Sequence, residues 1–241
     1  MKTKDWFTDW FNTSYYHILY KERNDKDAEL FMKNITSFLN LPKNTHILDL
    51  PCGKGRHSLF LNSLGYRVTG ADLAENSIRS AKAFENDTLK FKVHDMRQSL
   101  QYNYGAIFNL FTSFGYFDDD KEDLLILDNF KQGLKKDGYF VFDFLNAEKV
   151  KLNLVSKETK TVDNITFNIK REIKDGFIFK YISFLADDKN HFYTEQVKYL
   201  DLYKMKTFLK KNGFKILNIF GNYHLNTYEA NTSDRLIIVA K

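Results

Sequence analysis

The chain has 241 residues, a net charge of +5, 43% hydrophobic residues and 16% aromatic residues. This apolar content suffices for a packed core and excludes a chain that is disordered throughout. The single cysteine excludes an internal disulfide, and no apolar run is long enough to span a membrane. Because the N-terminus also lacks the cleavage site of a signal peptide, we expect a cytoplasmic protein with no membrane partner. The lysines are spread along the whole chain, which disfavours a nucleic-acid partner but leaves that alternative open.

Helices are expected first. Apolar residues from Leu30 to Leu39 recur at three- and four-residue spacing, which predicts a helix that Asn24 caps and that ends before Pro42. Upstream, the aromatic segment "YYHILYKER" ends in Arg23. We interpret residues 1–45 as an N-terminal helical cap or lid.

The pattern then alternates between short apolar strands and amphipathic helices. The predicted strands are residues 47–50, 67–71, 89–93, 106–111 and 139–144. The predicted helices are residues 56–64, 76–84 and 124–134. Strands that alternate with helices across short turns indicate a parallel sheet covered on both faces.

Residues 155–200 break this alternation. Four runs of alternating apolar and polar residues are separated by "DN", "DG" and "DKN", which are signals of hairpin turns. We therefore predict an antiparallel insertion over residues 155–200. A helix at 202–211 and strands at 214–220 and 235–240 complete a core made of residues 46–150 and 201–241.

The segment "LDLPCGKGRHS", residues 48–58, joins the first strand of the alternating region to its first helix. An open α/β sheet binds its ligand at such a turn, where glycines let the backbone come close and the helix start offers free N–H groups. Asp49, Asp72 and Asp95 end three successive strands. Three acids along one edge of the sheet predict a nucleoside cofactor, with a carboxylate on the ribose hydroxyls. The run "GKGRHS" is an imperfect match to the G-x-G-x-x-G of a dinucleotide site.

Four segments, in order, resemble the motifs of class I S-adenosylmethionine-dependent methyltransferases: "ILDLPCGKGRHS", "VTGADLAENSI", "HDM" and "LKKDGYFVFDF". A fifth, "SFGYFDDDKEDLLILDNF", resembles the bacterial small-molecule-type branch. The resemblance implies an α/β fold, with a Rossmann-like seven-stranded sheet whose last strand is antiparallel. Helices cover both faces, and the small β insertion follows the fifth strand. It also implies S-adenosylmethionine as cofactor, although Pro51 stands where many members have a glycine.

The resemblance further implies which residues bind this cofactor. It assigns the methionine part to Asp49, Gly53 and Gly55, and the ribose hydroxyls to Asp72. It assigns the adenine to Leu73, Asp95 and Met96, and it places Asn109 and Leu110 beside the sulfonium. Tyr20 and Arg23 are expected to form a flap, with a hydroxyl near the sulfonium and a guanidinium on the cofactor carboxylate. The alternative is an aromatic helix face that packs on the sheet.

Methyl transfer needs alignment and exclusion of water more than a catalytic triad. The catalytic residue is therefore not defined by the sequence, and the candidates are Tyr20, Tyr116 and His224. Further candidate acceptor contacts are Ser113, Phe114, Tyr223 and Tyr228. No metal is expected, because the six histidines are scattered and "FDDDKED" is typical of a charged helix start.

The favoured function is methyl transfer to an O or N atom of a small-molecule acceptor. Two alternatives stay open: a methyltransferase that acts on RNA or protein, and a non-catalytic module that binds the cofactor. The segment after the fourth strand, "NLFT", lacks the N/D-P-P-Y/F of amino-directed nucleic-acid methyltransferases. Methylation of ribose or guanine is untouched by this argument. We expect a monomer or a homodimer.

Overall fold

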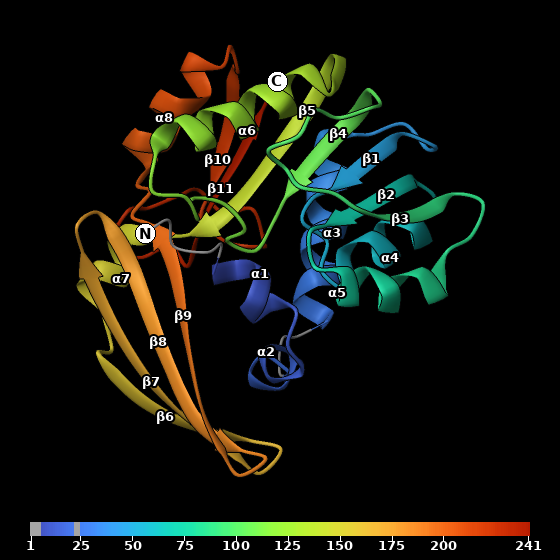
Figure 1. The fold of residues 1–241 in the computed structure, drawn as a ribbon. Helices are drawn as coiled ribbons and strands as arrows, with labels where there is room; N and C mark the ends of the chain where they lie inside the picture. Colours follow the sequence, from blue (N-terminus) through green and yellow to red (C-terminus); the bar gives the residue numbers. More distant parts are fainter. Residues whose placement is uncertain (1–5, 22–24) are drawn as a thin grey trace.

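The computed structural model describes residues 6–21 and 25–241, which form two β-sheets and the helices around them (Figure 1). Asn24, the predicted helix cap, lies outside the described residues. In the helix that follows it, α3 (Asp25–Leu39), Phe31, Ile35 and Leu39 of the predicted apolar stripe are buried, whereas Phe38 is exposed.

The larger sheet has seven strands in the order β10-β11-β5-β4-β1-β2-β3. Their bounds are β1 (His46–Asp49), β2 (Arg67–Asp72), β3 (Leu89–Val93), β4 (Tyr104–Asn109), β5 (Leu134–Leu145), β10 (Ile216–Phe220) and β11 (Arg235–Ala240). The first five strands pair in parallel, whereas β11 runs antiparallel to both of its neighbours. The predicted seven-stranded sheet with an antiparallel last strand is confirmed.

Helices cover both faces of this sheet. On one face lie α3, α4 (Arg56–Ser63) and α5 (Glu75–Ala81), which η1 (Lys82–Phe84) extends. On the other face lie α6 (Asp120–Gln132) and α8 (Leu202–Lys211). Successive residues of a strand point to opposite faces, so Phe140 and Phe142 pack on the α6 side while Val141 packs on the α3 side.

Two predicted boundaries near α6 are wrong. The helix starts at Asp120 rather than at residue 124, because the side chain of Asp119 accepts a hydrogen bond from the Lys121 amide and caps it. The strand β5 starts at Leu134, which pairs with Tyr104, rather than at residue 139. A short helix that the sequence analysis missed, α7 (Ala147–Leu152), follows β5.

The smaller sheet is an antiparallel meander in the order β6-β7-β8-β9. Its strands are β6 (Lys157–Val162), β7 (Ile165–Lys174), β8 (Phe177–Ala186) and β9 (Lys189–Lys198). Each of its three hairpin turns has two central residues with positive φ: Asp163 and Asn164, Asp175 and Gly176, and Asp187 and Asp188. This is the geometry that matches the twist of the flanking strands. The predicted antiparallel insertion after the fifth strand is confirmed.

The first two helices, α1 (Trp6–Phe11) and α2 (Ser14–Leu19), lie between the smaller sheet and the carboxyl edge of the larger one (Figure 1). Phe7 belongs to the core of the larger sheet. Trp10 is fully buried in the core of the smaller sheet, where its ring centroid lies 4.4 Å from that of Tyr193. The helix α1 therefore joins the two cores.

Candidate functional site

A cavity of about 580 Å³ lies at the carboxyl edge of the larger sheet. Its wall combines the strand-end loops after β1 to β4, the helices α1 and α2, and the strands β7 to β9. Of the predicted cofactor-binding residues, those that line it are Tyr20, Gly53, Asp72, Leu73, Asp95, Met96 and Leu110. Arg23 lies outside the described residues.

The glycine loop forms one side of the cavity. Gly53 has φ +55°, and a Cβ at its position would meet nothing within 4 Å, so there is room for a ligand against its backbone. Gly55 has φ +87° and does not line the cavity. A Cβ on Gly55 would lie 2.7 Å from the ring of Phe91, so this glycine is needed where the loop packs on the sheet.

The Asp72 carboxylate faces the same side of the cavity. One oxygen, Oδ2, accepts a hydrogen bond of 2.7 Å from the Gly53 amide, and the other, Oδ1, accepts one of 2.8 Å from the Ala74 amide. Burial raises the pKa of Asp72, and these backbone hydrogen bonds oppose the rise. Asp72 therefore shapes the glycine loop and presents a carboxylate to the cavity.

Asp49 and Asn109 lie behind the cavity wall rather than in it. Asp49 is fully buried, and its Oδ2 accepts a hydrogen bond of 2.6 Å from the Ser58 hydroxyl. Burial raises the pKa of Asp49 from its ordinary 3.8 to about 7. The Asn109 side-chain amide donates to the carbonyls of Leu50 and Ser113 at 2.9 and 3.1 Å. Asp49 and Asn109, like Gly55, support the loops from beneath.

Asp95 and Met96 follow β3 and line the cavity beside His94. The Asp95 carboxylate accepts hydrogen bonds from the Arg97 guanidinium, the shortest at 2.6 Å from Nη2. Burial alone would raise the pKa of Asp95, but the hydrogen bonds and charge of Arg97 outweigh it and keep the pKa below its ordinary value. The His94 Nε2 atom is buried and has no hydrogen-bond partner among the described residues. Asp95 thus brings a carboxylate to this end of the cavity, which His94 also lines.

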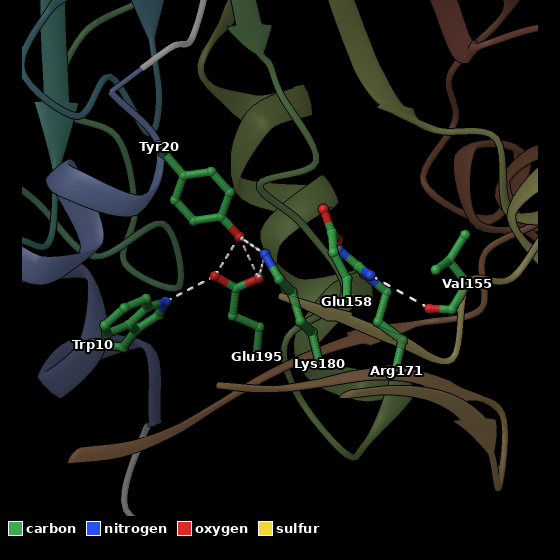
Figure 2. Close-up of polar contacts among 7 residues, drawn as sticks. All are labelled: Trp10, Tyr20, Val155, Glu158, Arg171, Lys180 and Glu195. Carbon is green, nitrogen blue, oxygen red and sulfur yellow. Dashed lines mark hydrogen bonds and ion pairs between the residues drawn. The ribbon is translucent and has the colours of Figure 1, made fainter. Parts of the chain in front are cut away.

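Tyr20 lies at the other end, against the smaller sheet (Figure 2). Its hydroxyl donates to the Glu195 carboxylate, with oxygen–oxygen distances of 2.6 and 2.7 Å, and accepts a hydrogen bond from Lys180 Nζ. The indole of Trp10 also donates to Glu195, at 2.8 Å. The end of α2 is therefore held against β8 and β9 by polar contacts.

The other two catalytic candidates differ from Tyr20. Tyr116 lines the cavity, but its hydroxyl donates to the Thr112 carbonyl at 3.1 Å and burial raises its pKa. His224 is exposed in the loop between β10 and β11 and does not line the cavity. His224 is therefore not a candidate catalytic residue of this cavity.

Among the candidate acceptor contacts, only Ser113 lines the cavity. Phe114 is buried in the core of the larger sheet. Tyr223 and Tyr228 do not line the cavity, and their hydroxyls donate to Asp143 at 3.2 Å and to Asn146 at 2.9 Å. The expectation that the loop between β10 and β11 contacts the acceptor is not supported by its position.

Sequence reasoning did not identify the residues that the smaller sheet contributes to the cavity. Three charged residues of β7, β8 and β9 line the cavity: Arg171, Lys180 and Glu195. A signal was present, because each interrupts an alternation of apolar residues on its strand. Charged residues on the apolar face of a strand mark a polar site.

Within residues 6–21 and 25–241, no three His, Cys, Asp or Glu side chains come together as a metal site. In the same part of the chain, no helix has both the length and the apolar character needed to cross a membrane.

A glycine loop after β1, acids after β2 and β3, and a cavity at this edge define an α/β protein that binds a nucleoside-like ligand. Residues 41–198, more than half of the chain, match the family described as "Methyltransferase domain". The chain belongs to this family. The resemblance found in the sequence is thereby confirmed.

Comparisons with individual proteins agree with this family. YqeM of Bacillus subtilis (strain 168) is 30% identical over 118 residues, which cover 46% of this chain and 47% of YqeM. The chain thus matches about half the length of this relative.

Solved structures extend the similarity to nearly the whole fold. An S-adenosylmethionine-dependent methyltransferase from Clostridium acetobutylicum ATCC 824 has a TM-score of 0.80 at 18% identity, covering 94% of this chain and 95% of its own. The sugar N-methyltransferase KedS8 from Streptoalloteichus sp ATCC 53650 has a TM-score of 0.70 at 16% identity, covering 93% and 91%. At these identities the likeness shows a shared fold.

Proposed function

We propose that this protein is an S-adenosylmethionine-dependent methyltransferase that transfers a methyl group to an N or O atom of a small-molecule acceptor. The observation that carries the proposal is one cavity that extends from Asp72 and Asp95 to the smaller sheet. Its volume of about 580 Å³ is in the range of small-molecule sites, which run from about 300 to 1,000 Å³.

The residues at the strand ends fit the cofactor. The Asp72 carboxylate lines the cavity and can accept both hydroxyls of a ribose, while Gly53 leaves space for the methionine part. The Asp95 carboxylate offers polar atoms to a base at the end of β3. Leu73 and Met96 supply apolar contacts for the same base.

The cofactor, when bound, supplies a methyl group that is already activated on a sulfonium. What remains for this chain is to bind, to orient and to exclude water. The wall between the strand ends and the smaller sheet is aromatic, formed by Trp6, Phe11, Tyr16 and Tyr116. Aromatic faces attract a cation and exclude water, and both properties suit this position.

Two observations support a small-molecule acceptor. Residues of α1, α2 and the smaller sheet line the cavity on the side away from the strand ends, and these elements lie opposite that edge of the larger sheet (Figure 1). KedS8, which shares the fold, acts on a sugar nitrogen as its name states. An amine that arrives protonated must lose its proton before attack, and Tyr20 is the candidate base that lines the cavity with its hydroxyl on a carboxylate.

The test is the Asp72→Ala variant, studied by calorimetry with S-adenosylhomocysteine. Removal of the charge-assisted bonds to ribose, each worth roughly 1.5–3 kcal/mol, should weaken binding at least about tenfold. Asp87→Ala, which removes an exposed acid outside the cavity, is the matched control and should bind as the wild-type protein does. Unchanged affinity of Asp72→Ala would contradict the proposed site. Transfer of labelled methyl groups to a panel of small amines and alcohols then tests the reaction.

A further inference from the structure

A row of four charged residues crosses the smaller sheet where it faces the cavity. Arg171 of β7 lies directly opposite Lys180 of β8, which lies directly opposite Glu195 of β9. Glu158 of β6 accepts a hydrogen bond from the Arg171 guanidinium at the other end of the row (Figure 2). The charges therefore run negative, positive, positive, negative, with the two cations adjacent.

The residues of β7, β8 and β9 that flank the row on this face are mostly apolar. On the two sides of the row, the paired residues are Ile169, Ile182 and Tyr193, and Ile173, Ile178 and Val197. The side chains of Arg171 and Lys180 are only 25% and 16% exposed, so water screens them weakly. Like charges directly opposite on neighbouring strands are destabilising, and the apolar surroundings increase that cost. A cation pair that costs stability here is explained if it serves a ligand.

The hydrogen-bond groups of the row point to the charge of that ligand. The Glu195 carboxylate already accepts from Trp10 and Tyr20 and lies 3.7 Å from Lys180 Nζ. It is therefore compensated and is a poor partner for a cationic ligand.

Arg171 is in the opposite situation. Its guanidinium has five N–H donors, of which one donates to Glu158 and one makes a long contact of 3.4 Å with the Val155 carbonyl. The Nε donor has no hydrogen bond among the described residues. A planar guanidinium with spare donors, beside a second cation and open to the cavity, matches a carboxylate or a phosphate.

We infer that the methyl acceptor carries an anionic group, a carboxylate or a phosphate, that binds between Arg171 and Lys180. The inference rests on the proposed function, because it concerns the acceptor of that same cavity. The anionic group would anchor the acceptor on the smaller sheet and leave its reacting atom directed toward the strand ends.

The experiment measures anion binding by calorimetry in the presence of saturating S-adenosylhomocysteine, at constant ionic strength. The probes are succinate, its neutral diamide and inorganic phosphate, so the two anionic arms distinguish a carboxylate from a phosphate. The variants are Arg171→Gln and Lys180→Met. Lys170→Gln is the matched control, because Lys170 is a neighbouring cation of β7 on the opposite face of the sheet.

We expect at least one anion to bind the wild-type protein, the neutral diamide not to bind, and each cavity variant to bind that anion at least tenfold more weakly. Lys170→Gln should bind it as the wild-type protein does. Affinity for S-adenosylhomocysteine should stay within about twofold in all variants.

Three results would overturn the inference: no preference for either anion over the diamide, an equal loss in Lys170→Gln, or a matching loss of S-adenosylhomocysteine affinity in Arg171→Gln. The last would mean that the pair holds the cofactor's own carboxylate. If the wild-type protein does not bind S-adenosylhomocysteine, the proposed function fails, and the same anion titration without it still tests the cation pair.

Discussion

The hydroxyl of Tyr20 and the carboxylate of Glu195 are 175 residues apart in the chain and 2.6 Å apart in space. This contact ties the end of α2 to β9 at the cavity wall (Figure 2). Because Trp10 donates to the same carboxylate, both N-terminal helices are attached to the smaller sheet. The two helices and that sheet thus form one wall of the cavity.

Tyr20→Phe should lower the free energy of unfolding by about 1–3 kcal/mol, because it removes a donor to a mostly buried carboxylate. Tyr15→Phe is the matched control, since the Tyr15 hydroxyl donates to Asp187 of the same sheet in an exposed position. Its loss should be below about 1 kcal/mol. Urea denaturation measures both. Equal losses in the free energy of unfolding would mean that the Tyr20 contact stabilises the protein no more than an exposed hydrogen bond does.

The smaller sheet is also attached to α6, by an ion pair between Lys198 and Asp123. Lys198 Nζ lies 2.5 Å from Asp123 Oδ2, and the two side chains are 3% and 0% exposed. Lys198→Met leaves a buried carboxylate with its main partner gone, so we expect a loss of about 3–5 kcal/mol. The double variant Lys198→Met/Asp123→Leu should recover much of that loss.

Lys174→Met is the control for the ion pair, because Lys174 contacts Asp175 at the surface, with side chains 67% and 82% exposed. Its effect should not exceed about 1 kcal/mol. A Lys198→Met protein as stable as this control would show that the buried pair does not hold the sheet in place.

Gly55→Ala should destabilise the protein by more than the strain of the left-handed backbone conformation alone. The left-handed conformation costs a non-glycine residue roughly 1–2 kcal/mol, and the new Cβ would also lie 2.7 Å from the Phe91 ring. Gly176→Ala is matched in conformation, with φ +79° and nothing within 4 Å. Thermal unfolding should therefore show a larger loss for Gly55→Ala, accompanied by weaker binding of S-adenosylhomocysteine. Equal losses would rule out the contact with Phe91 as a cause.

Asp49 should make stability fall as pH rises. Since burial raises its folded pKa to about 7, the folded protein holds a proton that the unfolded chain loses near pH 4. This stabilisation is complete below pH 4 and is lost progressively as the pH rises from 4 to 7. Over that range the free energy of unfolding should fall by at most about 1.36 kcal/mol per pH unit. Asp49→Asn cannot titrate, so the difference in unfolding free energy between wild type and variant should show this slope. A flat difference between pH 4 and 7 would contradict the raised pKa.

The fold could be predicted from the sequence because the signals for its helices, strands and turns are local. The period-two alternation and the paired turn residues, such as Asp175 and Gly176, define the smaller sheet without knowledge of its partners. The acidic residues of the site could be predicted for a related reason. Parallel strands end at one edge, so Asp72 and Asp95 had to approach each other there.

The residues on the acceptor side of the cavity could not be predicted in this way. Arg171, Lys180 and Glu195 meet because hairpin register sets them opposite one another, and because α1 and α2 dock on that face. Their place on the apolar face of each strand was a signal of a polar site, but the sequence does not show that α1 and α2 cover that face and form a cavity there. The loop that contains His224 shows the converse, since its aromatic and polar composition suggested a binding loop but its position is outside the cavity.

Residues 14–21 should become more protected from hydrogen exchange when S-adenosylhomocysteine binds. Tyr16, His17 and Tyr20 line the cavity, so ligand contacts there would offset the entropy of ordering this segment. In Glu195→Gln, which weakens the attachment of Tyr20, the free protein should exchange faster over the same residues and regain protection on binding. The helix α8, none of whose residues lines the cavity, serves as the internal control and should not change. Equal protection of residues 14–21 with and without ligand would mean that the N-terminal helices are fixed scaffold rather than a lid.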